Sequence, residues 1–326
     1  MKLSLTQLAA GLGIALGAAL VPAGAQATVI AQSILKIDGL TMRVANGGEG
    51  LSDTLFNPDN FTDVSGSQTG QAQANLNDGL DLGAGFVKNL NSPADLFVVA
   101  NEIHSVCEGA GCGGYVSPTD LNPLPATSTF AYAQTSLTGN MLLGIGANLL
   151  LDNTIALVGD NDGTAQSKID LGVTFNFTLA SGVSGLELRF SALEIFNQLI
   201  DTLGEFASGD NSFSFALIKS TDIDPIAEWN PTGGMTSGGT VYSSPFNLNR
   251  NSKTVNNPMF NSAYNSTSVS SNIFEFETGA LSAGIYQLSL GATVNAAGGS
   301  IPEPATLALL SIGLMGVGAA ARRRQA

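Results

Sequence analysis

The sequence is poor in the residue types on which most hydrolytic and metal-dependent enzymes rely. Its 326 residues include one histidine, His104, together with two cysteines and one tryptophan. A single histidine excludes an HExxH motif and a His-rich metal centre, because both need at least two imidazoles. The sequence also lacks a GxSxG elbow, a P-loop or a GxGxxG turn between a strand and a helix. We therefore expect no catalysis and a structural role for His104.

Charged residues are scarce and unbalanced. They make up 12% of the chain, with 12 Lys and Arg against 26 Asp and Glu, for a net charge of −14. An acidic surface repels phosphate backbones and anionic lipid headgroups, so this composition argues against nucleic-acid binding and peripheral membrane attachment. It suits a soluble surface in contact with divalent cations or a hydrated matrix.

The first 27 residues have the layout of a secretory signal peptide. Lys2 precedes an apolar stretch from Leu8 to Val21, and Ala25 and Ala27 form an A-x-A site. This order predicts cleavage by signal peptidase after Ala27 and export of the remaining chain. The alternative is an uncut membrane anchor, which the short apolar stretch and the small residues after it do not favour.

The C-terminal segment 301–326 contains three signals in sequence: a Pro-Glu-Pro triplet, the uncharged residues 305–321 and a cluster of arginines. The uncharged run is at the lower limit of a transmembrane helix, and the arginines would stay on the cytoplasmic side. Prolines oppose helix formation and hold the backbone extended, where a protease can bind it. The signal residues are Pro302, Glu303, Pro304, Arg322, Arg323 and Arg324.

This tail resembles the PEP-CTERM sorting signal of Gram-negative bacteria in the Pro-Glu-Pro triplet, the apolar segment that starts ATLALL and the arginine cluster. The resemblance implies processing by an exosortase, a membrane transpeptidase-like enzyme, after transient residence in the inner membrane. It also implies loss of the tail and delivery to the cell surface or extracellular matrix. Such proteins typically occur in bacteria that make exopolysaccharide and biofilm, so extracellular polysaccharide is an expected partner. An ordinary single-span anchor is the alternative, but it leaves the Pro-Glu-Pro unexplained.

Residues 28–295 are predicted to form a β-rich extracellular domain, followed by a short linker at 296–302. Segments of alternating apolar residues, such as the one from Val173 to Leu179, are separated by Gly- and Asn-rich turns. This pattern predicts an all-β fold, an antiparallel β-sandwich or a jelly-roll-like variant of it, with long loops and at most one or two short helices. The length allows one sandwich or two subdomains.

Three segments of the chain allow more specific structural predictions. Residues 45–95 contain few large apolar groups and indicate a long loop with only short strands. Apolar residues from Leu193 to Leu203 recur at helical spacing, which favours a short helix over a continued strand. Segments 271–279 and 283–294 are predicted to form a closing hairpin.

The two cysteines, Cys107 and Cys112, lie in the segment HSVCEGAGCGG. Outside the cytoplasm two thiols at this spacing most simply form a disulfide. A metal or redox site with Glu102 and His104 is the alternative, but tetrahedral sites normally contain two such cysteine pairs.

Two other functions stay open at this point. Trp229 and Tyr242 could stack on sugar rings and make the domain a carbohydrate-binding module, although a lone tryptophan is more often a core residue. A pair of carboxylates could hydrolyse glycosides without histidine. The candidate acids are Glu187, Glu194, Glu275 and Glu277, of which Glu275 and Glu277 alternate with phenylalanines as on a solvated strand face.

The turn VGDNDG offers the oxygens of Asp160 and Asp162 as calcium ligands. An EF-hand frame with Gly163 at the glycine position puts Val158 first and Ile169 twelfth, so that pattern fails. We expect no cofactor, with calcium as the alternative. The sequence as a whole indicates an exported, exosortase-sorted structural or adhesive protein of the cell surface or biofilm matrix.

Overall fold

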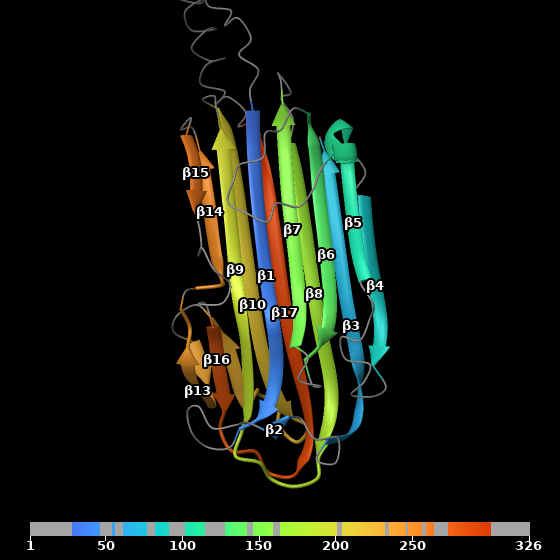
Figure 1. Cartoon of the computed structure of the whole chain (residues 1–326), viewed down its shortest axis with the longest axis vertical. Coiled ribbons are helices and arrows are strands. Elements are labelled where there is room, and N and C mark those ends of the chain that lie inside the picture. The colour runs from blue at the N-terminus through green and yellow to red at the C-terminus, as the bar shows by residue number, and fades with distance from the viewer. Residues whose placement is uncertain are drawn as a thin grey trace, which may run out of the picture.

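The computed structural model of the chain is an all-β structure (Figure 1). The residues that it describes are 28–45, 54–55, 61–76, 82–90, 102–114, 128–141, 146–158, 164–200, 204–231, 235–245, 247–255, 259–263 and 273–300. Within them the non-strand element is one short 3-10 helix, η2 (Ala110–Gly114). The predicted all-β class is therefore confirmed. The signal peptide, the Asp160–Asp162 turn and the sorting signal lie outside the described residues.

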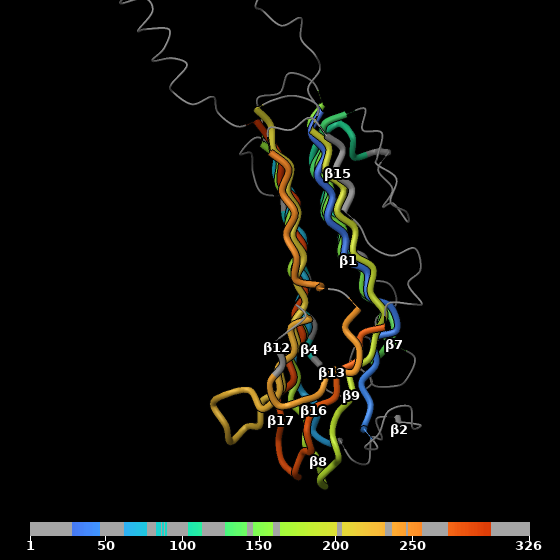
Figure 2. The backbone as a smooth tube through the Cα atoms, turned by 90° about the vertical axis from the view of Figure 1, so that its left-hand side faces the viewer, coloured from blue at the N-terminus to red at the C-terminus, as the bar shows by residue number. Residues whose placement is uncertain are grey.

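The strands form two antiparallel sheets that pack face to face along the long axis of the molecule (Figure 2). Sheet A has the strand order β13-β16-β9-β1-β7-β6-β5, with β15 pairing with β9 and β2 with β1. Its strands are β1 (Thr28–Val44), β2 (Thr54–Leu55), β5 (Glu102–Gly109), β6 (Phe130–Asn140), β7 (Gly146–Val158), β9 (Leu186–Ile200), β13 (Gly239–Ser243), β15 (Met259–Ala263) and β16 (Ile273–Thr278).

Sheet B has the order β12-β11-β10-β17-β8-β3-β4, with β14 pairing with β10. Its strands are β3 (Phe61–Leu76), β4 (Leu82–Leu90), β8 (Thr164–Leu179), β10 (Glu205–Lys219), β11 (Ala227–Asn230), β12 (Met235–Ser237), β14 (Arg250–Val255) and β17 (Gly284–Ser300). The last strand, β17, is central, because it pairs with β10 on one side and β8 on the other.

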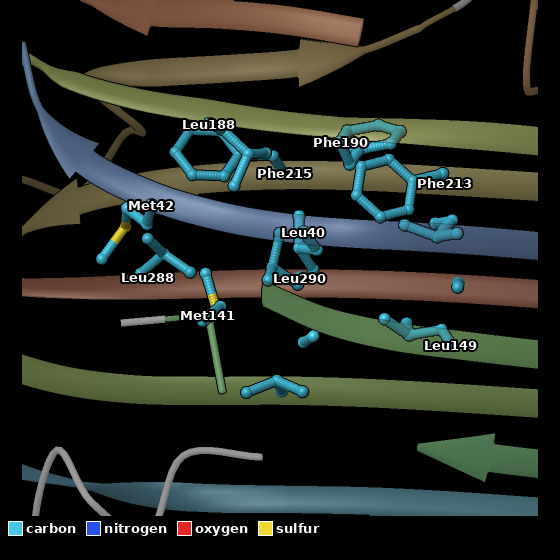
Figure 3. Close-up of a cluster of buried hydrophobic side chains, with 14 of the residues drawn as sticks. Leu40, Met42, Met141, Leu149, Leu188, Phe190, Phe213, Phe215, Leu288 and Leu290 are labelled. Atoms are coloured by element: carbon cyan, nitrogen blue, oxygen red, sulfur yellow. The ribbon is translucent and has the colours of Figure 1, made fainter. Parts of the chain in front are cut away.

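Alternation along the strands builds the main core. In β8 every second residue from Ile169 to Leu179 is buried, while the residues between them face outward. Leucine, methionine and phenylalanine side chains from β1, β9, β10 and β17 meet between the sheets in the same way (Figure 3). Aromatic rings stack at this level, with centroids 5.1 Å apart for Phe190 and Phe274. Burial of this apolar area is the main force that holds the two sheets together.

Beyond this core, a second and smaller apolar cluster lies where β1 begins and β17 ends. Its members are mostly small: Val29, Ala31, Ala74, Ala131, Ile155, Leu157, Ala165, Ile200, Ala207 and Ala296. Gly298 also packs here, since a Cβ on it would come within 2.7 Å of side-chain atoms of Val29 and Ile155. The beginning of β1 and the end of β17 therefore lie against each other at one end of the sandwich (Figure 1).

The helix predicted from Leu193 to Leu203 is wrong, because β9 continues as a strand to Ile200. Ile195 and Phe196 are adjacent in sequence and both buried, on opposite faces of sheet A. A strand that is covered on both faces loses its two-residue period, and the remaining apolar pattern imitates a helix.

The prediction of a loop over residues 45–95 is also wrong, since β3 pairs with β8 and β4 over most of its length. The inward positions of β3 carry small or polar residues, including Gln68, Gly70, Ala72 and Ala74. These small or polar residues fit where the two sheets lie close together. They do not produce an alternation of large apolar residues in the sequence.

The closing hairpin and the linker need correction too. β16 pairs with β9 and β13 in sheet A, whereas β17 belongs to sheet B, so the two do not form a hairpin. β17 remains paired up to Ser300, so residues 296–300 are part of the sheet and not of a linker.

Candidate functional site

A buried carboxyl group, that of Glu194, occupies the space between the sheets. β9 directs this side chain inward, and it is 0% exposed. Asn211 Nδ2 donates a hydrogen bond to Glu194 Oε1 at 3.2 Å, and Arg250 Nη1 lies 3.7 Å from Oε2. Burial raises the pKa of Glu194 to about 7, against the opposing effects of the Asn211 hydrogen bond and the Arg250 charge.

Glu194 belongs to a polar layer that joins both sheets between the aromatic core and the small-residue cluster. Ser33 Oγ donates to Asn211 Oδ1 at 2.6 Å, and Asn211 Nδ2 also donates to the backbone oxygen of Ile34. Asn153 donates to the backbone oxygen of Val294. Both oxygens of Glu194 face protein groups, so this carboxyl is suited to bind a proton and set stability, not to attack a substrate.

The other three candidate acids lie on the outer face of sheet A. Glu187 and Glu194 are an odd number of positions apart on the same strand, so their side chains project from opposite faces. Glu275 and Glu277 alternate with Phe274 and Phe276, which are both 0% exposed, as expected for a strand with one solvated face. Glu194 is thus not paired with any of these three acids.

Two of the outer acids, Glu187 and Glu275, have basic neighbours. Glu277 is the cross-strand neighbour of Glu187, which is itself opposite Arg43. Arg189 Nε lies 3.8 Å from Glu275 Oε2. Opposite charges on adjacent strands stabilise the pairing of the sheet, which is a sufficient role for Glu187 and Glu275, whereas the like charges of Glu187 and Glu277 directly opposite each other disfavour that pair.

Trp229 is a core residue, as is usual for a lone tryptophan, and it is not exposed for the alternative role in sugar stacking. The side chain is 1% exposed, and its ring stacks on Phe276 at 5.3 Å and contacts Phe190 at 5.7 Å. β11 directs Trp229 inward and its neighbour Glu228 outward. Tyr242 on β13 is 37% exposed. The two aromatic residues therefore do not share a surface.

The disulfide between Cys107 and Cys112 is confirmed, with the two Cα atoms 5.7 Å apart. It ties the end of β5 to η2. Because the sulfur atoms bond to each other, they do not serve as metal ligands beside Glu102 and His104. In the part of the chain that the structure describes, no group of three His, Cys, Asp or Glu side chains is placed to hold a metal ion.

A surface groove of about 460 Å³ lies on the outer face of sheet B. Three strands contribute its lining, which consists of Thr69, Gly70, Gln71, Gly83, Ala84, Gly85, Val87 and Asp170. Sequence reasoning missed this site, although the glycines of the segment LGAGFVKNL were a visible signal. Glycines at outward positions leave a depression where other residues would place side chains.

The apolar segment 305–321, expected to cross the membrane, lies outside the described residues. Among those that are described, no helix is long and apolar enough to span a bilayer.

Comparison with known proteins gives one informative match. Residues 300–324 match the PEP-CTERM protein-sorting motif. No curated protein matches the chain. The InvG secretin domain β-barrel from the Salmonella SPI-1 injectisome NC-base shares 8% identity and a TM-score of 0.12, over 95% of this chain and 74% of that one. A similarity as weak as the last says nothing about fold or function.

The motif match covers the triplet, the apolar segment and the arginine cluster that carried the resemblance in the sequence. It begins at Ser300, the last residue of β17. A motif of this kind implies export and targeting by an exosortase. The chain is therefore a PEP-CTERM domain-containing protein.

Proposed function

We propose that this chain is an exosortase-sorted structural or adhesive protein of the cell surface or biofilm matrix, without catalytic activity. The observation that carries the proposal is the PEP-CTERM motif at residues 300–324, which begins at the last residue of the final strand of a β-sandwich. In this function the tail directs the protein to the surface, and the sandwich is the part that remains there.

The geometry of the sandwich supports a domain held at one end. β1 starts at Thr28, directly after the expected signal-peptidase site, and β17 ends at Ser300. These two strand ends lie against each other at Gly298 and Val29. Anchoring through either end would therefore leave the other end of the long sandwich directed away from the membrane.

Four features favour a structural role without catalysis. The one tryptophan is in the core, and Glu194 is enclosed between the sheets and separated from the other candidate acids. The outer acids Glu187 and Glu275 have arginine neighbours on adjacent strands. Extensive antiparallel pairing also gives a rigid body that suits a structural component.

Cell fractionation and intact mass measurement of the full-length protein test the proposal. The informative variant replaces Pro302, Glu303 and Pro304 with alanines. We expect the wild type to start at Thr28, to lack the tail and to reach the outer surface or medium, while the variant keeps its tail in the inner membrane. A matched control replaces the exposed loop residues Thr221, Asp222 and Ile223 with alanines and is expected to be sorted like the wild type.

Two results would contradict the proposal. If wild type and triplet variant both keep residues 305–326 and both fractionate with the inner membrane, the tail is an ordinary anchor and the surface role is wrong. Release of reducing ends from polysaccharide by the purified protein, lost on Glu187→Gln, would contradict the absence of catalysis.

A further inference from the structure

The outer face of sheet B presents short polar side chains in register across five strands. One row runs from β10 to β4 and consists of Ser212, Thr293, Asp170, Gln71 and Gly85. With strands about 4.8 Å apart, the row is about 19 Å long. It is therefore long enough to follow an extended polymer for several repeating units.

The next row forms a depression in the outer surface of sheet B, because two residues at its centre are glycines. It consists of Ser214, Gly291, Gly172, Thr69 and Val87. Thr69 Oγ1 donates to the backbone oxygen of Gly172 at 3.4 Å and so leans over the glycine. The groove of about 460 Å³ occupies the end of these two rows, over β8, β3 and β4. Its volume is within the range of small-ligand sites.

The charge of the groove is balanced. Asp170 is its one charged lining residue, and Lys168 Nζ lies 2.7 Å from Asp170 Oδ2. Thr293 Oγ1 donates to the other carboxylate oxygen at 3.1 Å. A partner therefore meets hydroxyl, amide and paired charged groups without a net charge, while the chain as a whole carries −14. This combination favours an uncharged partner over an anionic one.

The chemistry of the lining matches an uncharged, hydroxyl-rich chain. Gln71 is exposed and has both amide donors and a carbonyl acceptor for hydroxyl groups. Val87 is 76% exposed at the side of the groove and offers an apolar contact for the CH face of a sugar ring. The glycine floor at Gly83 and Gly85 allows a ring to approach the backbone of β4.

We propose that this groove, with the polar rows that continue from it, binds a neutral polysaccharide. The inference deepens the proposed function and rests on it for the setting in which the protein meets polysaccharide. It assigns the binding face to the outer side of sheet B, on the opposite side of the sandwich from the outer acids of β9 and β16.

Affinity gel electrophoresis of the full-length protein in mild detergent tests this site. The gels contain dextran or hydroxyethyl cellulose as neutral probes and alginate as an anionic probe. We expect at least one neutral polymer to slow migration, and alginate to have no such effect. Gln71→Ala removes hydrogen bonds and should weaken the binding about fivefold.

A variant whose added side chain fills the groove provides a second test of the site. Gly83→Leu adds a side chain where a Cβ has its nearest neighbours at 3.9 Å, so it occupies the groove without a clash. We expect it to abolish retardation while the thermal midpoint stays within a few degrees of the wild type. Gln166→Ala changes an exposed glutamine of the same face that does not line the groove, and should bind like the wild type.

Three other outcomes would contradict the proposed binding site. Migration unaffected by both neutral polymers means that they do not bind. Equal retardation of the wild type, Gln71→Ala and Gly83→Leu means that they bind elsewhere, and retardation by alginate alone contradicts the argument from charge. None of these results changes the outcome of the sorting experiment, so failure of the site and failure of the proposed function are distinguishable.

Discussion

Gly298 near the end of β17 lies directly against Val29 near the start of β1. A Cβ on Gly298 would come 2.7 Å from Val29 Cγ1 and 2.7 Å from Ile155 Cδ1, atoms of the opposite sheet. The missing side chain allows the two sheets to approach each other at the end where the first strand begins and the last strand ends. This contact packs the end of the last strand against the small-residue cluster of the core.

Gly298→Val should therefore destabilise the domain. The added side chain overpacks a closed contact between the sheets, which costs about 1–3 kcal/mol of unfolding free energy. Urea denaturation followed by circular dichroism measures this loss. Gly83→Ala is the matched control, since its Cβ meets its nearest neighbours at 3.9 Å. Equal midpoints for Gly298→Val and wild type would show that the sheets are not in contact here.

Glu194 should make stability depend on pH. Its pKa rises from 4.5 to about 7 on folding, so the folded protein binds this proton more tightly than the unfolded chain does. The stabilising contribution is fully present below pH 4.5 and is lost as the pH rises through about 7. The shift corresponds to a loss on the order of 3 kcal/mol.

Urea midpoints between pH 4.5 and 8.5 test this effect. Glu194→Gln keeps the acceptor for Asn211 but does not titrate, so its profile should be flatter and its stability above pH 7 should exceed that of the wild type. Glu275→Gln changes a partly exposed acid on the outer face and should keep the wild-type profile. A wild-type profile that is as flat as that of Glu194→Gln would contradict the raised pKa.

Trp229→Ala should reduce stability by about 3–5 kcal/mol, because it leaves a large cavity among Phe190, Phe274 and Phe276. Chemical denaturation measures the change. Tyr242→Ala removes a more exposed ring and should cost less than about 1 kcal/mol. If Trp229→Ala were as stable as Tyr242→Ala, the placement of the indole in the core would be wrong.

Replacing both Cys107 and Cys112 with serine should lower stability by about 2 kcal/mol. The bridged residues are 5 positions apart, and a loop this short removes little entropy from the unfolded chain. Thermal unfolding with and without dithiothreitol separates this effect from that of the serines. The reductant should lower the midpoint of the wild type and leave that of the double variant unchanged; an unchanged wild-type midpoint would argue against the bridge.

Local patterns in the sequence predicted the parts of the fold that depend on local rules. The alternation of Val173, Phe175 and Phe177 identified β8, and the spacing of the cysteines in an exported chain identified the disulfide. Patterns failed where a strand is covered on both faces, as in β9, or where the core is thin and lined with small residues, as in β3. In both cases burial no longer follows large apolar side chains at every second position.

Candidate site residues divide in the same way. The sequence located Glu187, Glu194 and Trp229 as residues of interest, but their environments depend on strand parity and on which sheet each strand joins. The odd number of positions between Glu187 and Glu194 is enough to place their side chains on opposite faces of β9. The burial of Trp229, in contrast, requires β16 of the opposite sheet to supply Phe276. The groove on sheet B is formed by β3, β4 and β8, which are distant in the chain and become neighbours only after pairing.

The sequence by itself determined the sorting signal of this protein, because such a signal is read as a linear segment whose order of proline, apolar and basic residues is the message. It also determined the all-β class through alternation. Tertiary structure alone decided which acid is enclosed, which aromatic ring is in the core and where a polymer can lie. Those properties arise from contacts between strands far apart in the chain, and a linear pattern does not contain them.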